Sequence, residues 1–172
     1  PIVAWWMNKT EEEQQKDIDA QMDRLEKVFT DAAAYVRVRA MERAPADGAL
    51  PTDLRFEGMR SVLKGAADQR PVFILANDYD QITQAVKFCV KHGLRCVIVG
   101  GHDSPLCAEL LKRHNVAVIV PGTIRFPKRD DSPFDEAFSL PARLEELGVK
   151  WTLASGEEVW CQLFSEPVAG SD

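Results

Sequence analysis

Polar residues and glycines follow four apolar segments of this chain, where a parallel sheet would carry its functional groups. Because the carboxyl ends of parallel strands meet at one edge, we expect these residues to share a rim. The predicted binding residues are Asn77, Asp78, Gly100, Gly101, His102, Asp103, Thr123, Ser155 and Glu157. His102 and Asp78 are the candidates for a catalytic role, and the expected ligand is a small molecule.

The rim carries none of the short motifs that identify phosphate or nucleophile chemistry. The chain has no GxGxxG, no GxxxxGK[ST] and no GxSxG pattern. Ser155 lacks an evident His–Asp pair, although His102 could approach it across the rim. One histidine with scattered carboxylates falls short of the three protein ligands usual for catalytic zinc, so we predict no metal site and no cofactor.

Two simpler interpretations of the rim stay open. Asp78 could cap the helix that follows it, and Asp103 or Ser104 could cap the next helix. Alternatively, Gly100 and Gly101 could bind an anion where they lead into a helix of an open, flavodoxin-like sheet. The acidic side chain of Asp103 argues against such an anion site.

The elements that must position these residues alternate between strands and helices. Residues 71–76 form a continuous apolar run, typical of a strand that is buried on both faces. The other predicted strands are 95–99, 116–120 and 149–154, and the helices between them are 80–92, 104–114 and 139–148. Alternation with short loops requires parallel strands and right-handed crossovers, so we predict an α/β fold with a parallel four-stranded sheet.

The N-terminal part of the chain is predicted to be helical. Thr10 and Glu13 form a capping box at the start of one long amphipathic helix that ends near Arg43. Its predicted apolar stripe consists of Ile18, Met22, Leu25, Phe29, Ala32 and Val36. A second short helix follows, with an apolar face of Leu54, Met59, Val62 and Leu63. We therefore divide the chain into a helical segment, 1–69, and a βα-repeat domain, 70–172.

Composition narrows the functional classes. The 172 residues carry a net charge of −6, whereas general nucleic-acid binders need a basic excess, so no nucleic-acid partner is expected. No apolar run approaches the roughly 18 residues that span a membrane. The four cysteines include no CxxC pair, which favours a reducing, cytoplasmic location. The chain begins at Pro1 without an initiator methionine, so we expect it to be part of something longer.

Residues 70–155 resemble the second half of amidohydrolase-superfamily barrels, closest to the imidazolonepropionase-like branch. The resemblance is carried by residues 71–78, 94–101, 118–122, 139–144 and 148–156. It implies that the four strands correspond to strands five to eight of a (β/α)8 TIM barrel, of which this chain holds half. A complete barrel needs about 200 residues or more, so the length excludes one.

The resemblance also implies a set of metal ligands, and this chain does not retain them. In the family one or two divalent metals activate water through an HxH pair, two further histidines and an aspartate. The HxH half is missing here, and the later positions hold Leu75, Gly100 and Ser155, with His102 and Glu157 nearby. Leucine and glycine side chains cannot coordinate a metal.

Two hypotheses of different classes follow. The first is a non-catalytic amidohydrolase-like fragment or degenerate relative, whose open sheet edges are covered by a homo-oligomer or by the missing barrel half. The second is a metal-dependent hydrolase of cyclic amides, of which this chain is one part, with zinc held by His102 and nearby carboxylates. Stoichiometric zinc distinguishes the second hypothesis from the first.

Overall fold

The computed structural model describes residues 10–41, 52–123, 133–155 and 160–161. The chain divides into two compact units, Pro1–Ala67 and Asp68–Asp172, and each is described by itself. No helix in the described ranges is long and apolar enough to cross a membrane.

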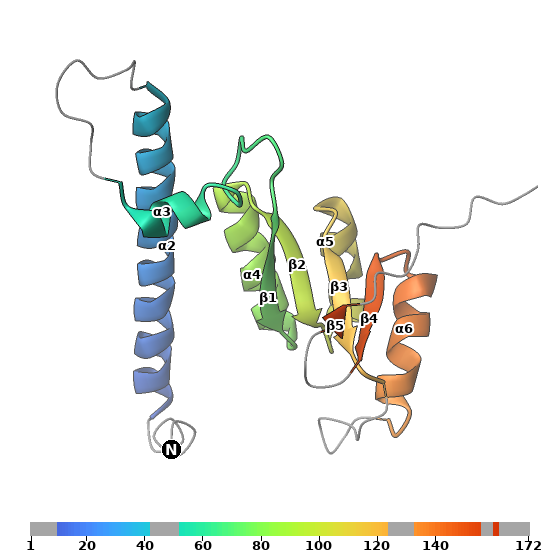
Figure 1. Ribbon diagram of the computed structural model, residues 1–172. Helices are drawn as coiled ribbons and strands as arrows, with labels where there is room; N and C mark the ends of the chain where they lie inside the picture. Colours follow the sequence, from blue (N-terminus) through green and yellow to red (C-terminus); the bar gives the residue numbers. More distant parts are fainter. Residues whose placement is uncertain (1–9, 42–51, 124–132, 156–159, 162–172) are drawn as a thin grey trace, which may run out of the picture. The chain divides into compact units, whose positions relative to one another are not determined.

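The first unit is built on a long helix, α2, which spans Glu11–Met41 (Figure 1). Its predicted capping box is confirmed. The backbone N–H of Glu13 donates to Thr10 Oγ1 at 3.3 Å, and the backbone N–H of Thr10 donates to Glu13 Oε2 at 3.0 Å. Both bonds satisfy donors near the first turn that have no partner within the helix. The predicted end at residue 43 lies outside the described residues.

The apolar stripe of α2 is only partly covered within this unit. Ala32 is fully buried, whereas Ile18 and Leu25 keep 38% and 48% of their surface exposed. The members of the stripe recur at spacings of four and three, so they form a narrow apolar line along the helix. Such a line is typical of a helix that packs against one neighbour. The 3.6-residue period therefore predicts the helix correctly, but it does not identify what covers the stripe.

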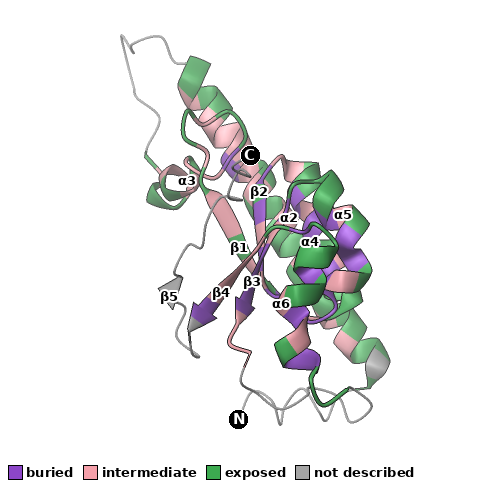
Figure 2. Cartoon of the chain, turned by 90° about the vertical axis from the view of Figure 1, so that its right-hand side faces the viewer, coloured by how far each residue is buried: buried purple, intermediate pink, exposed green. Residues whose placement is uncertain are grey.

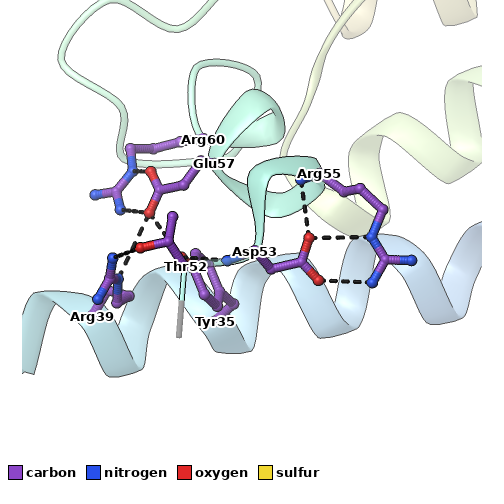
Figure 3. A network of polar contacts seen from close by, with 7 residues as sticks. All are labelled: Tyr35, Arg39, Thr52, Asp53, Arg55, Glu57 and Arg60. Carbon is purple, nitrogen blue, oxygen red and sulfur yellow. Dashed lines mark hydrogen bonds and ion pairs between the residues drawn. The ribbon is translucent and has the colours of Figure 1, made fainter. Parts of the chain in front are cut away.

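A short helix, α3, spans Leu54–Met59 and is held against α2 by polar side chains (Figure 3). Tyr35 donates to Glu57 Oε1 at 2.9 Å and accepts from the backbone N–H of Asp53 at 3.3 Å. Arg39 donates to Thr52 Oγ1 at 2.9 Å. The predicted apolar face of α3 is wrong in part, because Leu54 is 81% exposed while Leu63, beyond the helix, is buried. Side-chain hydrogen bonds therefore help to hold α3 against α2.

The second unit is a five-stranded sheet with the order β1-β2-β3-β4-β5. Its first four strands are parallel and each pairs with the next along the chain, which confirms the predicted α/β fold. Their bounds are β1 Pro71–Ala76, β2 Arg95–Gly100, β3 Ala117–Pro121 and β4 Trp151–Ser155. A fifth strand, β5 at Trp160–Cys161, pairs antiparallel with β4. The sequence does not predict β5, since two residues carry no readable period.

The connecting helices that the structure describes in this unit cover one face of the sheet (Figure 2). They are α4 Tyr79–His92, the 3-10 helix η1 Ser104–Cys107, α5 Ala108–Arg113 and α6 Glu136–Glu146. When each strand pairs with its successor through a right-handed crossover, every helix falls on the same side. Side chains on that side form the core: Ile98, Val118 and Val120 are completely buried.

The opposite face of the sheet is open at β1, which corrects the prediction that residues 71–76 are buried on both faces. On the same face of β3, Ile119 is 3% exposed. Phe73 and Leu75 alternate along β1 and remain 58% and 75% exposed. Their register partners on β2 are Val97 and Val99, which are half-buried. An apolar run indicates strand structure, but it cannot say whether the layer that would cover its second face is present.

The last helix also begins earlier than the sequence indicates. We expect a start near Ser139 and Pro141, but α6 begins at Glu136 and contains Pro141 in its interior. Proline is unfavourable there because it cannot donate a helical hydrogen bond. Ala137, Leu140 and Leu144 are buried on the sheet side, and this packing outweighs the local preference of the proline.

Candidate functional site

Two glycines at the end of β2 allow the chain to turn sharply at the rim. Gly100 and Gly101 have φ values of +106° and +66°, a conformation that other residues rarely adopt. The backbone N–H of Gly101 donates to the carbonyl oxygen of Ala76 at 2.8 Å. A Cβ at Gly101 would lie 2.5 Å from Cγ1 of Val118, so only glycine fits. The turn places His102, Asp103 and Ser104, which are buried, in the layer of helices.

His102 is buried in this layer between two carboxylates from its own chain. Only 7% of its surface is exposed. Its Nδ1 lies 2.9 Å from Oδ1 of Asp103, and its Nε2 lies against Oε1 of Glu136 at the start of α6. Carboxylate oxygens only accept hydrogen bonds when ionised, so each ring nitrogen of His102 faces an acceptor.

Asp103 connects this histidine to α4. Its Oδ2 accepts from the backbone N–H of Tyr79 at 3.1 Å, and its own N–H donates to the carbonyl oxygen of Asn77 at 2.8 Å. Asp103 therefore caps the helix that follows β1, which corrects the interpretation that it caps the helix after it in sequence. The chain of contacts from Tyr79 through Asp103 and His102 to Glu136 ties the amino ends of α4 and α6 together.

Within this cluster, Glu136 is not predicted from the sequence, and Ser104 is expected only as a helix cap. Glu136 is 9% exposed, and its Oε2 has no hydrogen-bond partner among the described residues. Ser104 is completely buried and donates to the carbonyl oxygen of Gly101. Glu136 follows a loop rather than a strand, so a search confined to strand ends cannot find it. Its place in the first turn of α6 is the available signal, because acidic residues favour that position.

The remaining predicted residues do not join His102 in one cluster. Asp78 is exposed and forms a capping box with Gln81 at the start of α4, as the simpler interpretation expects. Thr123 is half-buried beyond β3, and Ser155 ends β4. Glu157 lies outside the described residues. The rim thus exists, but its described part splits into a buried cluster and exposed helix caps.

The residues present do not fit the metal centre that the resemblance implies. Among the described residues, no group of three or more histidine, cysteine, aspartate or glutamate side chains is placed to hold a metal. Leu75, at the expected position of a histidine, is exposed on the open face of the sheet. Gly100, at the next expected position, has no side chain and turns the backbone instead.

Comparison with known proteins gives one fold-level likeness. No family model and no curated protein matches the sequence. The crystal structure of amidohydrolase from Thermotoga maritima MSB8 matches with a TM-score of 0.62 and 21% sequence identity. The match covers 76% of this chain and 33% of that protein, so the chain spans a third of its length. At this identity the likeness establishes an amidohydrolase-like α/β fold and leaves the activity and the branch of the family open.

Proposed function

We propose that this chain is a non-hydrolytic relative of the amidohydrolases, in which the rim around His102 has become a structural and binding feature. The proposal rests first on the fold-level likeness to an amidohydrolase of known structure. It rests equally on what occupies the rim. A hydrolase of this kind needs ligands that hold a metal and a water molecule, and the described rim offers helix caps and a histidine enclosed by two carboxylates.

The observation that carries the proposal is the position of the buried His102 ring between two carboxylates. One nitrogen faces Asp103 and the other faces Glu136. An imidazole coordinates a metal or accepts a proton only through a nitrogen whose lone pair is free. One of these nitrogens would have to turn away from its carboxylate before His102 could do either. Burial of the ring makes such a rearrangement unfavourable, since it would leave a carboxylate without its partner.

Zinc binding and hydrolysis test this proposal directly. The full chain is equilibrated with zinc chloride, freed of excess metal and assayed by plasma mass spectrometry. The same sample is then incubated with hydantoin, a simple cyclic amide. We expect less than stoichiometric zinc and no hydrolysis above a buffer control. Stoichiometric zinc that is lost in a His102→Gln variant, together with ring opening of hydantoin, would support the metal-dependent hydrolase and overturn the proposal.

The open face of the sheet suggests how such a relative is completed. Phe73 and Leu75 expose apolar surface directly beside the outer edge of β1, which has no strand neighbour among the described residues. Unpaired edges invite pairing with another chain. We propose that a second copy pairs along β1 in a two-fold arrangement that continues the sheet and covers these side chains. A polypeptide that supplies the missing barrel half is the alternative occupant.

A further inference from the structure

A cavity lies at the opposite edge of the α/β unit from His102, where the strands begin. Its volume is about 270 Å³, and it is lined by Pro71 of β1, Arg95 of β2 and Lys150 just before β4. Residues of α4 complete it, so the cavity lies on the helical side of the sheet. We call this cavity the amino-edge pocket. None of the binding residues predicted from the sequence contributes to it.

The inner lining of the amino-edge pocket is apolar. Val86 and Leu94 contribute aliphatic side chains that are 1% and 8% exposed. Cys89 and Cys96 add two buried thiols, which behave as small hydrophobic groups when they are not oxidised. A ligand in this pocket would therefore need an apolar body, because these lining side chains pack more favourably against apolar groups than against water.

The mouth of the pocket is basic. Arg95, His114 and Lys150 line it, and no acidic side chain is among its lining residues. Within the described part of the chain, neither Arg95 nor Lys150 forms an ion pair. Arg95 uses Nη1 to donate to the carbonyl oxygen of Gln69 at 2.8 Å, which positions the guanidinium and leaves other N–H groups for a ligand. In a chain of net charge −6, such a cluster is a local exception.

We propose that the amino-edge pocket binds a small carboxylate with an apolar body. The guanidinium of Arg95 and the ammonium of Lys150 contact the carboxylate, and the aliphatic and thiol lining surrounds the body. The volume is slightly below the roughly 300–1,000 Å³ of sites for drug-sized ligands, so the ligand is of the size of a single-ring acid. This assignment is independent of whether the rim around His102 hydrolyses anything.

Benzoate is the probe for the first test, with benzamide as its neutral match. Each is titrated into the full chain and followed by chemical-shift changes of the backbone amides of residues 94–97 and 115–117. We expect benzoate to bind about tenfold more tightly than benzamide, since even a partly solvated cation–carboxylate contact contributes on the order of 1.4 kcal/mol. Equal affinities would overturn the role of charge. Inorganic phosphate that binds as tightly as benzoate would overturn the role of the apolar body.

Charge-neutral variants locate the site. Lys150→Gln and Arg95→Gln should each weaken benzoate binding by about tenfold. Lys87→Gln is the matched control, because it removes one positive charge from the exposed side of α4 and does not line the pocket. Far-UV circular dichroism confirms that each variant is folded. Benzoate affinity that falls equally in all three variants reports only net charge and would overturn the assignment, as would affinity unchanged in Lys150→Gln and Arg95→Gln.

Discussion

The backbone N–H of Tyr79 donates to Oδ2 of Asp103 at 3.1 Å, so a residue after β2 caps the helix that follows β1. The same carboxylate uses Oδ1 to hold His102. This arrangement makes Asp103 a junction between α4 and the loop that carries His102. It also explains why a buried carboxylate is tolerated at the rim, since both of its oxygens have donors.

Replacing Asp103 should therefore destabilise the fold far more than replacing Asp78. We expect Asp103→Ala to lower the free energy of unfolding by about 3 kcal/mol, because it removes a helix cap and leaves His102 with an unmatched nitrogen. Asp78→Ala, at an exposed cap of the same helix, should cost about 1 kcal/mol. Urea denaturation of both variants measures the difference. Equal losses would show that Asp103 acts as an ordinary cap.

Gly101 offers a second test of how the rim is built. Gly101→Ala places a methyl group against Val118 in a backbone conformation that alanine avoids, and should destabilise the protein by about 3 kcal/mol. Gly58→Ala is the control, because the residue lies in α3 and no atom lies within 4 Å of its new methyl group apart from its chain neighbours and the backbone of its own helix. That change should stabilise the helix by about 0.5–1 kcal/mol. Thermal unfolding measures both variants. Unfolding midpoints that shift in the same direction from the wild-type value would contradict this account.

The sequence predicts the four parallel strands because each is a short apolar run bounded by polar or turn residues. It also predicts Asp78 as a cap, since capping depends on neighbours in sequence. Glu136 and the cap made by Asp103 are not predictable in this way. His102 and Glu136 are separated in the sequence by β3, so their contact is a property of the fold. The exposure of Leu75 likewise depends on what packs against that face of the sheet and not on its own segment.

The open face of the sheet predicts an association that depends on Leu75. Multi-angle light scattering of the full chain should give the mass of a dimer at high protein concentration. Leu75→Glu should give a monomer, since it introduces charge into the apolar surface beside β1. Leu75 is 75% exposed, so the variant should keep its core and its circular dichroism spectrum. A wild-type chain that stays monomeric would contradict pairing with a second copy.

The packing of α3 on α2 should depend on pH through Glu57. Hydrogen bonds from Arg60, and then from Tyr35, hold the pKa of the Glu57 carboxyl below its ordinary value of 4.5. A carboxyl whose pKa is lowered by folding stabilises the folded state above its unfolded pKa. That contribution is lost as the pH falls through the lowered value. The association of the two helices should therefore be unchanged from pH 7 to about 5 and weaken at lower pH.

Hydrogen exchange of the Asp53 amide reports this change, because that N–H donates to the hydroxyl oxygen of Tyr35. After correction for intrinsic exchange rates, the protection of this amide in the full chain should decrease when the pH drops below 4.5, the ordinary pKa of Glu57. Glu57→Gln keeps an acceptor for Tyr35 but carries no charge, so protection in this variant should be lower at pH 7 and lose its pH dependence. Protection that falls equally in both proteins would assign the effect to another carboxylate, of which Asp53, paired with Arg55, is the nearest candidate.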